Sequence, residues 1–536
     1  MTKIALIFPP SVLPTNPPLG LAQLLAHLRG EGAEVRGFDL NLRYRELMIR
    51  KVMDGEIVMK LRNRLPPPVN EILLDRSAEV LRGRKGEEFF VARRYNQYAS
   101  FYRYAFDELD KMFVDVASQG LYGQKGTWME AFLSELIEPV RAYRPDMVGF
   151  SLLFTQQILY ALILAKEFKP LGIPLIAGGP AASSVPQAFF GSLNVKEHSI
   201  DVGSLIDYVV VGEGEVPLAA LAEGFDDPSK VPGLVYRRGR IFETESQVAE
   251  DLDALPPPDY GDFDLTDYYS PSPVLPIAAS RGCYWRRCSF CVHYKSYLRH
   301  RVKSVEKVVE EMEALQKRYG ANHFSFVDEM IHPKQFEKLS DSLITADLGV
   351  RFYALAKPTK EFDRPLLQKM HRAGARAILW GVESGNQRLL DLMEKGTKVE
   401  EMEGVLRAAS EVGIWNMAFV LFGFPTETRE EFLETLEFLK RNRLHIGTLG
   451  QSIFTLEIDS PVYRTPEKFK VREIKTARNP FYAACDFQVE EGLSPKEVYE
   501  LKNRHEEELN SLYKVSPEFG YYRNHMLLYA ERQERD

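Results

Sequence analysis

Three of the chain's four cysteines lie within nine residues, spaced C-x4-C-x2-C. They are Cys283, Cys288 and Cys291. Three thiolates this close can bind one metal centre without the chain folding back. A closed zinc site or a fully protein-ligated iron-sulfur cluster needs a fourth ligand, so the spacing favours a 4Fe-4S cluster with one iron open for a substrate or cofactor. The alternatives are a zinc site completed by His293 or His300, and unliganded buried thiols; Cys485 is most simply a small buried hydrophobe.

The composition restricts the class of protein. The chain has 536 residues, 45% hydrophobic and 27% charged, which is ordinary for a globular protein of two to four domains. A net charge of -8 gives no attraction to phosphate backbones, so we expect no nucleic-acid partner. Four cysteines do not form a disulfide framework, and no apolar run is long enough for a signal peptide or a membrane span. The sequence therefore predicts a cytoplasmic protein.

The elements before the cysteines alternate between strand and helix patterns. Strand-like apolar runs occupy 3–8, 34–39, 147–151, 174–180 and 208–211, and helical periodicity separates several of them. This alternation predicts an α/β domain over 1–250 with a doubly wound, Rossmann-like parallel sheet. An aromatic-rich insertion at about 41–140 predicts helices, broken by prolines at 65–68. Its aromatic residues favour helix packing, with a lid over the ligand edge as the alternative.

Ligands bind doubly wound sheets outside the carboxyl ends of the strands. Four loops are predicted to lie at that edge: 9–20, 151–155, 178–180 and 212–215. Glycine in three of these loops allows backbone amides to approach a large ligand closely. The alternative is a flavodoxin-like sheet that holds no cofactor and acts only as a scaffold.

A Pro- and Asp-rich segment at 251–272 predicts a linker, and a second regular pattern follows it. Strand-like runs start near 274, 323, 351, 376, 416 and 449, with helix-like runs between them. Six β-α repeats over 273–460 are too few for the closed eight-fold barrel. Beyond them, 461–536 predict a mixed α/β C-terminal cap on the substrate side. Chemistry in a barrel sits where strands end, which directs attention to Asp328, Lys357, Glu383 and Ser384.

The three-cysteine loop resembles that of the radical S-adenosylmethionine (radical SAM) family, although its first spacing is one residue longer than the commonest pattern. The segments 381–385 (GVESG) and 423–428 (GFPTET) resemble those of radical SAM proteins that carry cobalamin domains. The order of the N-terminal glycine-containing segments resembles their cobalamin-binding domain. The resemblance implies an open (β/α)6 radical SAM barrel whose cluster binds the amino and carboxylate groups of SAM.

The resemblance also assigns residues to ligands. Phe290 would lie near the adenine of SAM, and Glu383 and Ser384 would contact its ribose or amino acid portion. Asp328 and Lys357 are weaker candidates, and the alternative for Glu383 is a cap on the following helix. The residues implied in cobalamin binding are Pro18, Leu19, Gly20, Ser151, Thr155, Gly178, Gly179, Pro180, Gly212 and Glu213. Because the chain lacks an Asp-x-His-x-x-Gly signature, the cobalamin would be bound base-off.

The implied activity is a cobalamin-dependent radical SAM methyltransferase acting on an unactivated carbon of a small-molecule or peptide substrate. An electron donor such as flavodoxin or ferredoxin would reduce the cluster of a monomeric enzyme. A radical cyclase or rearrangement enzyme without methyl transfer is the main alternative, and a cobalamin or redox sensor is the non-enzymatic one. A methylthiotransferase is disfavoured, because its second cluster would need about three more cysteines.

Overall fold

The computed structural model describes residues 2–61, 69–121, 127–195, 198–224, 227–249, 251–295, 297 and 299–533. The expected proline break at 65–68 lies outside these residues. The chain forms two compact units. The first comprises Met1–Pro273, Lys295–Leu298 and Asn479–Tyr482, and the second comprises Val274–Tyr294, Arg299–Arg478 and Ala483–Asp536. None of the helices in the described part of the chain has both the length and the apolar composition needed to cross a bilayer.

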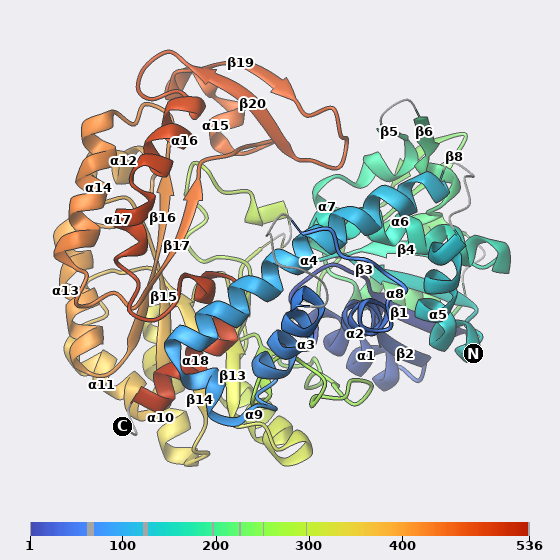
Figure 1. The fold of residues 1–536 in the computed structure, drawn as a ribbon, viewed down its shortest axis with the longest axis horizontal. Coiled ribbons are helices and arrows are strands. Elements are labelled where there is room, and N and C mark those ends of the chain that lie inside the picture. The colour runs from blue at the N-terminus through green and yellow to red at the C-terminus, as the bar shows by residue number, and fades with distance from the viewer. Residues whose placement is uncertain are drawn as a thin grey trace. The chain divides into compact units, whose positions relative to one another are not determined.

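The first unit is built on a seven-stranded sheet (Figure 1). Its order is β2 (Glu34–Asp39), β1 (Lys3–Phe8), β3 (Met147–Ser151), β4 (Leu175–Gly178), β7 (Tyr208–Val210), β8 (Leu234–Arg238) and β9 (Arg240–Glu243). The first five strands are parallel, which confirms the predicted doubly wound domain, and β8 and β9 extend the sheet antiparallel. The strand order reverses between β1 and β3, and a ligand crevice is expected at this point.

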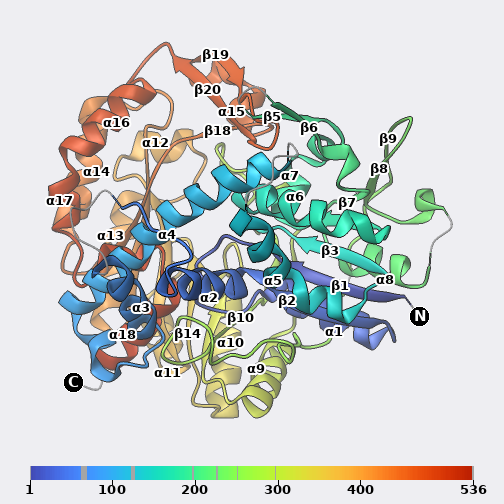
Figure 2. The same cartoon turned by 45° about the vertical axis from the view of Figure 1, so that its right-hand side comes forward.

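Helices cover the first sheet on both faces (Figure 2). They include α1 (Leu19–Gly30), α6 (Gln156–Phe168) and α8 (Glu215–Ala222), and the insertion supplies α2 (Leu40–Met53), α3 (Val69–Leu81), α4 (Ala92–Leu121) and α5 (Thr127–Tyr143). The aromatic residues of the insertion pack internally, as predicted: Tyr95, Tyr102, Phe106 and Phe113 are fully buried. The carboxylate of Asp110 on α4 accepts hydrogen bonds from Ser11 Oγ at 2.6 Å and Tyr44 Oη at 2.8 Å, and thereby fixes α4 to the loop after β1.

The segment 251–272 is folded against the first unit. Arg29 of α1 forms ion pairs with Asp259 at 2.6 Å and Asp262 at 2.7 Å, and Tyr268 donates a hydrogen bond to Asp39 at 2.7 Å. Tyr269 is fully buried. Side-chain pairing therefore holds this segment, which was predicted as a linker, in place.

The second unit contains a six-stranded parallel sheet, which confirms the predicted radical SAM-type barrel (Figure 1). Its strands are, in order, β10 (Val274–Ile277), β13 (His323–Phe326), β14 (Arg351–Ala356), β15 (Ala375–Glu383), β16 (Trp415–Phe422) and β17 (Thr448–Ile453). The connecting helices are α9 (Val305–Tyr319), α10 (Pro333–Ala346), α11 (Arg364–Arg372), α12 (Gln387–Leu392), α13 (Val399–Glu411) and α14 (Arg429–Arg441). A capping box formed by Thr428 and Glu431 starts α14 directly after the GFPTET segment.

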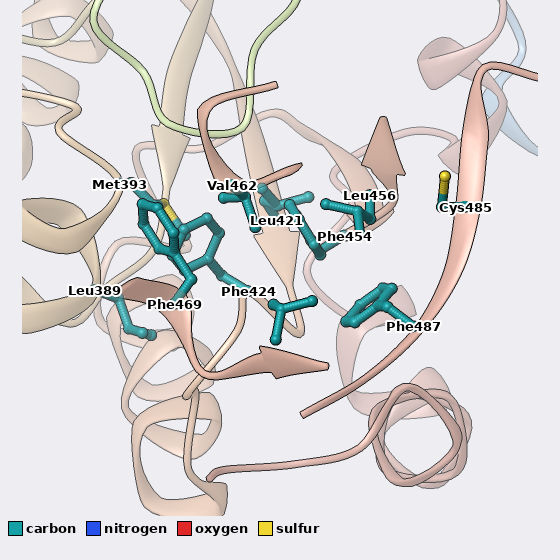
Figure 3. Close-up of a cluster of buried hydrophobic side chains, with 11 residues drawn as sticks. Leu389, Met393, Leu421, Phe424, Phe454, Leu456, Val462, Phe469, Cys485 and Phe487 are labelled. Atoms are coloured by element: carbon teal, nitrogen blue, oxygen red, sulfur yellow. The ribbon is translucent and has the colours of Figure 1, made fainter. Parts of the chain in front are cut away.

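The C-terminal region adds a three-stranded antiparallel sheet of β18 (Leu456–Glu457), β20 (Ala484–Val489) and β19 (Val471–Thr476), and ends in α18 (Arg523–Gln533). Figure 3 shows the apolar cluster that joins this sheet to the barrel. Met393, Phe424, Phe454 and Phe469 meet in it. Cys485 on β20 lies in the same cluster and is 6% exposed, so it packs as a small hydrophobe.

Candidate active site

The three-cysteine loop follows the short strand β11 (Ser280–Arg281). Cys283, Cys288 and Cys291 are free and partly exposed. Backbone hydrogen bonds fix the loop from both sides: Ser289 N donates to Met393 O at 2.9 Å, and Ser289 O accepts from Val462 N at 3.1 Å. The loop is therefore held between the end of α12 and the start of the C-terminal cap.

The donor set fits a cluster with one open iron. Burial raises the pKa of the Cys288 thiol, and it raises that of Cys291 to about 12, so a positive metal centre would be needed to hold them as thiolates. His293 is hydrogen-bonded to Glu329 at 2.9 Å. Within the described residues, no three His, Cys, Asp or Glu side chains converge on one point. A mononuclear site requires such convergence, whereas the cysteines of a cluster each bind a different iron.

Two lysines and an acid lie beside the thiols. Lys395 Nζ donates to Glu383 Oε1 at 2.6 Å, and both side chains are largely buried. Lys357 Nζ lies 3.2 Å from the centroid of the Trp285 ring, and burial, followed by the charge of Lys395, lowers its pKa to about 8. The Trp285 indole donates to Glu394 O at 2.8 Å. The end of β14, the end of β15 and the cysteine loop thus form one charged and aromatic surface.

Glu383 is held in an unusual conformation. Its φ is +65°, and the pairing of β15 with β16 shifts register between Gly381 and Glu383. A non-glycine residue in the left-handed region costs free energy, and such residues cluster at functional sites. The bulge turns the carboxylate toward Lys395.

The remaining predicted SAM contacts have internal partners. Asp328 is fully buried, accepts from Ala279 N at 3.0 Å and Ser280 Oγ at 2.5 Å, and burial raises its pKa to about 6. Ser384 Oγ contacts Thr435 Oγ1 at 3.1 Å and accepts from Asn386 N at 3.1 Å. Both residues position the loops that carry the site. Phe290 packs at the edge of the apolar cluster, with Lys395 Nζ 6.0 Å from its ring.

Lys395 is the central residue to which the sequence assigned no ligand role. Trp285 lies in the cysteine loop, where Tyr284, Trp285, Arg286 and Arg287 were expected either to favour an anionic or aromatic ligand or to pack the loop. A lysine twelve residues after Glu383 becomes significant only when α12 brings it back to the end of β15. Gly396 makes this return possible, because a Cβ there would lie 2.2 Å from the Trp285 ring.

The ten residues predicted to bind cobalamin all lie at the carboxyl edge of the first sheet. Pro18, Leu19 and Gly20 start α1, and a Cβ on Gly20 would lie 3.9 Å from Ser151 Oγ at the end of β3. Thr155 precedes α6. Gly178, Gly179 and Pro180 join β4 to the short helix α7 (Pro180–Ser184), and Gly212 and Glu213 join β7 to α8. The four predicted loops therefore meet at one edge.

Hydrogen bonds shape that edge. Gln157 Oε1 accepts from the amides of Leu153 and Phe154, at 2.9 and 3.0 Å, while its amide nitrogen donates to Pro9 O at 2.7 Å. Leu153 and Phe154 are 46% and 43% exposed, which leaves an apolar surface at the switch point. Gly179 has φ +94°, and a Cβ there would lie 2.6 Å from Leu152 O. None of the four loops contains a histidine. An apolar edge of this kind fits a large ring without a histidine ligand.

Comparison with known proteins agrees with this geometry. Residues 277–439 match the family described as the radical SAM superfamily. An uncharacterized methyltransferase of Pyrococcus horikoshii is 26% identical over 319 residues, 58% of this chain and 67% of that protein. The anaerobic magnesium-protoporphyrin IX monomethyl ester cyclase of Rubrivivax gelatinosus is 31% identical over 317 residues, 56% of this chain and 54% of that protein. The chain thus spans about half to two thirds of the length of these relatives.

Among solved structures, the radical SAM methyltransferase TsrM of Kitasatospora setae has a similar fold. Its complex with tryptophan and a SAM analogue gives a TM-score of 0.64 at 18% identity, covering 100% of this chain and 98% of that one. Its structure with cobalamin and a [4Fe-4S] cluster gives 0.60 at 19% identity, covering 94% and 85%. Residues 277–439, which include the cysteine loop, are therefore similar to the radical SAM superfamily. In this chain a Rossmann-like sheet precedes that region, and the fold is similar to that of TsrM.

Proposed function

We propose that the protein is a cobalamin-dependent radical SAM methyltransferase that methylates an unactivated carbon of a small-molecule or peptide substrate. The observation that supports this proposal is that one chain contains two candidate binding sites, each at the ends of the strands of a parallel sheet. One is a three-thiol loop beside the Lys395–Glu383 pair, and the other is a histidine-free apolar edge on a doubly wound sheet. Methyltransferase names among the relatives support the activity.

When bound, the reduced cluster supplies the electron that cleaves SAM, and methylcobalamin supplies the methyl group. The residues of the chain bind and orient these groups. Cys283, Cys288 and Cys291 would hold three irons. Lys395 and Glu383 would pair with the carboxylate and amino groups of SAM, and the Trp285 ring with Lys357 would form a wall that excludes water.

The loops of the first unit would bind cobalamin base-off. These loops would recognise cobalamin by their shape, because the backbone amides of Leu153 and Phe154 already donate hydrogen bonds to Gln157. Exposed Leu153 and Phe154 would cover the apolar face of the ring, and the close approach at Gly179 would hold the loops after β3 and β4 together.

We also propose a monomeric, cytoplasmic enzyme reduced by flavodoxin or ferredoxin. Arg286 and Arg287 support a donor of that kind, because they are exposed and lie within the cysteine loop. Acidic redox proteins dock on such basic surfaces through complementary charge.

Anaerobic reconstitution with iron, sulfide and methylcobalamin, followed by addition of SAM and reduced flavodoxin, tests the proposal. We expect bound iron, a bound corrin spectrum and cleavage of SAM to methionine and 5'-deoxyadenosine. A product heavier by one CH2 supports methyl transfer. A product of unchanged mass, or one that has lost hydrogen, supports the cyclase alternative, which the 31% identical cyclase favours. A protein that takes up no corrin contradicts the methyl-donor assignment.

A further inference from the structure

The cysteine loop carries two aromatic rings directly after its first cysteine. Tyr284 and Trp285 follow Cys283 within the four-residue spacing that separates it from the second cysteine. The Trp285 side chain is fixed, because its indole donates to Glu394 O at 2.8 Å and Gly396 lies directly against its ring. The loop therefore presents a held aromatic surface beside the thiols.

Lys357, the residue that follows β14, brings a positive charge to this surface. Its Nζ lies 3.2 Å from the centroid of the Trp285 ring and 6.0 Å from that of the Tyr284 ring. The same atom lies 3.4 Å from Lys395 O, and Lys357 is only 3% exposed. An aromatic face attracts a desolvated cation but carries no net charge. The rings therefore hold the ammonium group in place without neutralising it.

The charge of Lys357 acts on the cysteine thiolates. Burial, followed by the charge of Lys395, lowers the pKa of Lys357. The thiolates of Cys288 and Cys283 raise this pKa, and the carboxylate of Glu361 raises it less than they do. The thiolates are therefore the negative charges that stabilise the ammonium group most.

The other cations near the thiols are offset in different ways. Lys395 Nζ donates to Glu383 Oε1 at 2.6 Å, so the two charges of this buried pair largely cancel. Arg286 and Arg287 are exposed, so water and salt screen their charges. Lys357 is buried and pairs with no carboxylate among the residues that the structure describes. Its charge therefore reaches the thiols without such an offset.

We propose that Lys357 raises the reduction potential of the cluster that Cys283, Cys288 and Cys291 would hold. This proposal rests on the cluster of the proposed function, and gives Lys357 an electrostatic role in its reduction. In that step one electron passes from flavodoxin or ferredoxin to the cluster, and no bond forms or breaks. The cluster with its thiolates becomes more negative by one charge. A fixed positive charge in a site of low dielectric stabilises this reduced form more than the oxidised one.

Redox titration tests the proposal without turnover. The full-length protein is reconstituted with iron and sulfide, and the EPR signal of the reduced cluster is followed against potential at pH 7, without SAM, corrin or substrate. Lys357→Met and Lys357→Gln should each make reduction about ten-fold less favourable, which lowers the potential by about 59 mV for a one-electron couple. Lys357→Arg keeps the positive charge and should restore most of the wild-type potential. Lys360→Met, which changes an exposed lysine of the same loop, is the control and should leave the potential unchanged.

Several results would overturn this role of Lys357. One is a wild-type potential in both neutral variants at unchanged iron content. If SAM affinity fell ten-fold while the potential stayed the same, Lys357 would serve as a SAM ligand instead. If neither neutral variant took up iron, Lys357 would be needed to build the loop and not to set its potential. An equal shift in Lys360→Met would show that the position of the charge is unimportant. Failure of corrin binding or methyl transfer in wild type would leave the titration unaffected, so the two proposals can fail separately.

Discussion

The two parallel sheets of this chain end in loops of opposite character. At the barrel edge, charged side chains have direct hydrogen-bond partners: Lys395 donates to Glu383 at 2.6 Å, and Ser280 donates to Asp328 at 2.5 Å. At the edge of the first sheet, a neutral amide and a glycine shape the loops after β3 and β4, through Gln157 and Gly179. The barrel site therefore depends on particular functional groups, whereas the first site depends on how closely backbones approach. The two sites should respond differently to substitution.

The largest expected effect is in the cysteine loop. Cys288→Ala should abolish the brown chromophore and all SAM cleavage, because two thiolates cannot hold the cluster. Corrin binding by the first unit should persist. Cys485→Ala is the matched control: it removes a thiol from the apolar cluster of Figure 3, costs about 1 kcal/mol of stability and leaves the chromophore intact. Iron content and absorbance measure both variants. A chromophore retained in Cys288→Ala would place the cluster elsewhere.

The Lys395–Glu383 pair should give the next largest effect. Lys395→Met leaves a mostly buried carboxylate without its partner, so SAM affinity should fall by about ten-fold or more and the protein should be destabilised. Lys398→Met is the control, since Lys398 is exposed and pairs only loosely with Glu401 at 3.9 Å. A double-mutant cycle with Glu383→Gln should show strong coupling. If the effects of the two substitutions on SAM affinity were additive, Lys395 and Glu383 would act independently in binding SAM.

The same comparison explains what the sequence could predict. Local spacing predicted the cluster ligands Cys283, Cys288 and Cys291, and apolar runs predicted the six barrel strands. Both signals lie in contiguous sequence, so they do not depend on tertiary contacts. Lys395 gains its surroundings from residues distant in sequence, so no local pattern could pair it with Glu383. The composition of 251–272 suggested a linker because Pro and Asp dominate it. The ion pairs of Arg29 with Asp259 and Asp262 depend on tertiary contacts that composition does not encode.

The antiparallel extension of the first sheet was also missed. Strands β8 and β9 meet at Gly239 in a hairpin whose tip is arginine-rich, from Arg237 to Arg240. Only the start of β8 is buried. An exposed edge hairpin of this kind lacks the continuous apolar run that identified β1, β3 and β7. Prediction therefore succeeded for strands that carry a buried apolar run and failed for this exposed hairpin.

Gly179 tests the dependence of the first unit on backbone approach. Gly179→Ala places a Cβ 2.6 Å from Leu152 O at a φ of +94°, which should cost about 1–3 kcal/mol and weaken corrin binding. SAM cleavage by the barrel should remain. Gly172→Ala provides the control, because Gly172 also has positive φ, at +68°, but no atom lies within 4 Å of its Cβ. Equal losses of corrin binding in both variants would show that strain alone, and not the closeness of the loops, is responsible.

The smallest expected effect is on the pH dependence of stability. It compares one buried carboxyl group from each unit. Asp39 accepts hydrogen bonds from Tyr268 and Leu42, Asp328 accepts from Ser280 and Ala279, and burial raises the pKa of each to about 6. A carboxyl in the unfolded chain titrates near 3.9, so the folded state binds the proton more tightly. Each group should therefore lower the free energy of unfolding as pH rises from about 4 to about 6, by at most about 3 kcal/mol.

Asp39→Asn and Asp328→Asn should each flatten this decline and stabilise the protein above pH 6, as measured by denaturant unfolding between pH 4 and 8. The two variants should differ in activity. Asp39 lies at the start of α2, in the unit that does not contain the cysteine loop, so Asp39→Asn should leave SAM cleavage unchanged. Asp328 holds the strand that leads into that loop, so Asp328→Asn should slow cleavage several-fold. If both variants kept the wild-type pH slope, these carboxyls would have ordinary pKa values in the folded protein. If Asp328→Asn cleaved SAM at the wild-type rate, its hydrogen bonds to Ser280 and Ala279 would not position the cluster loop.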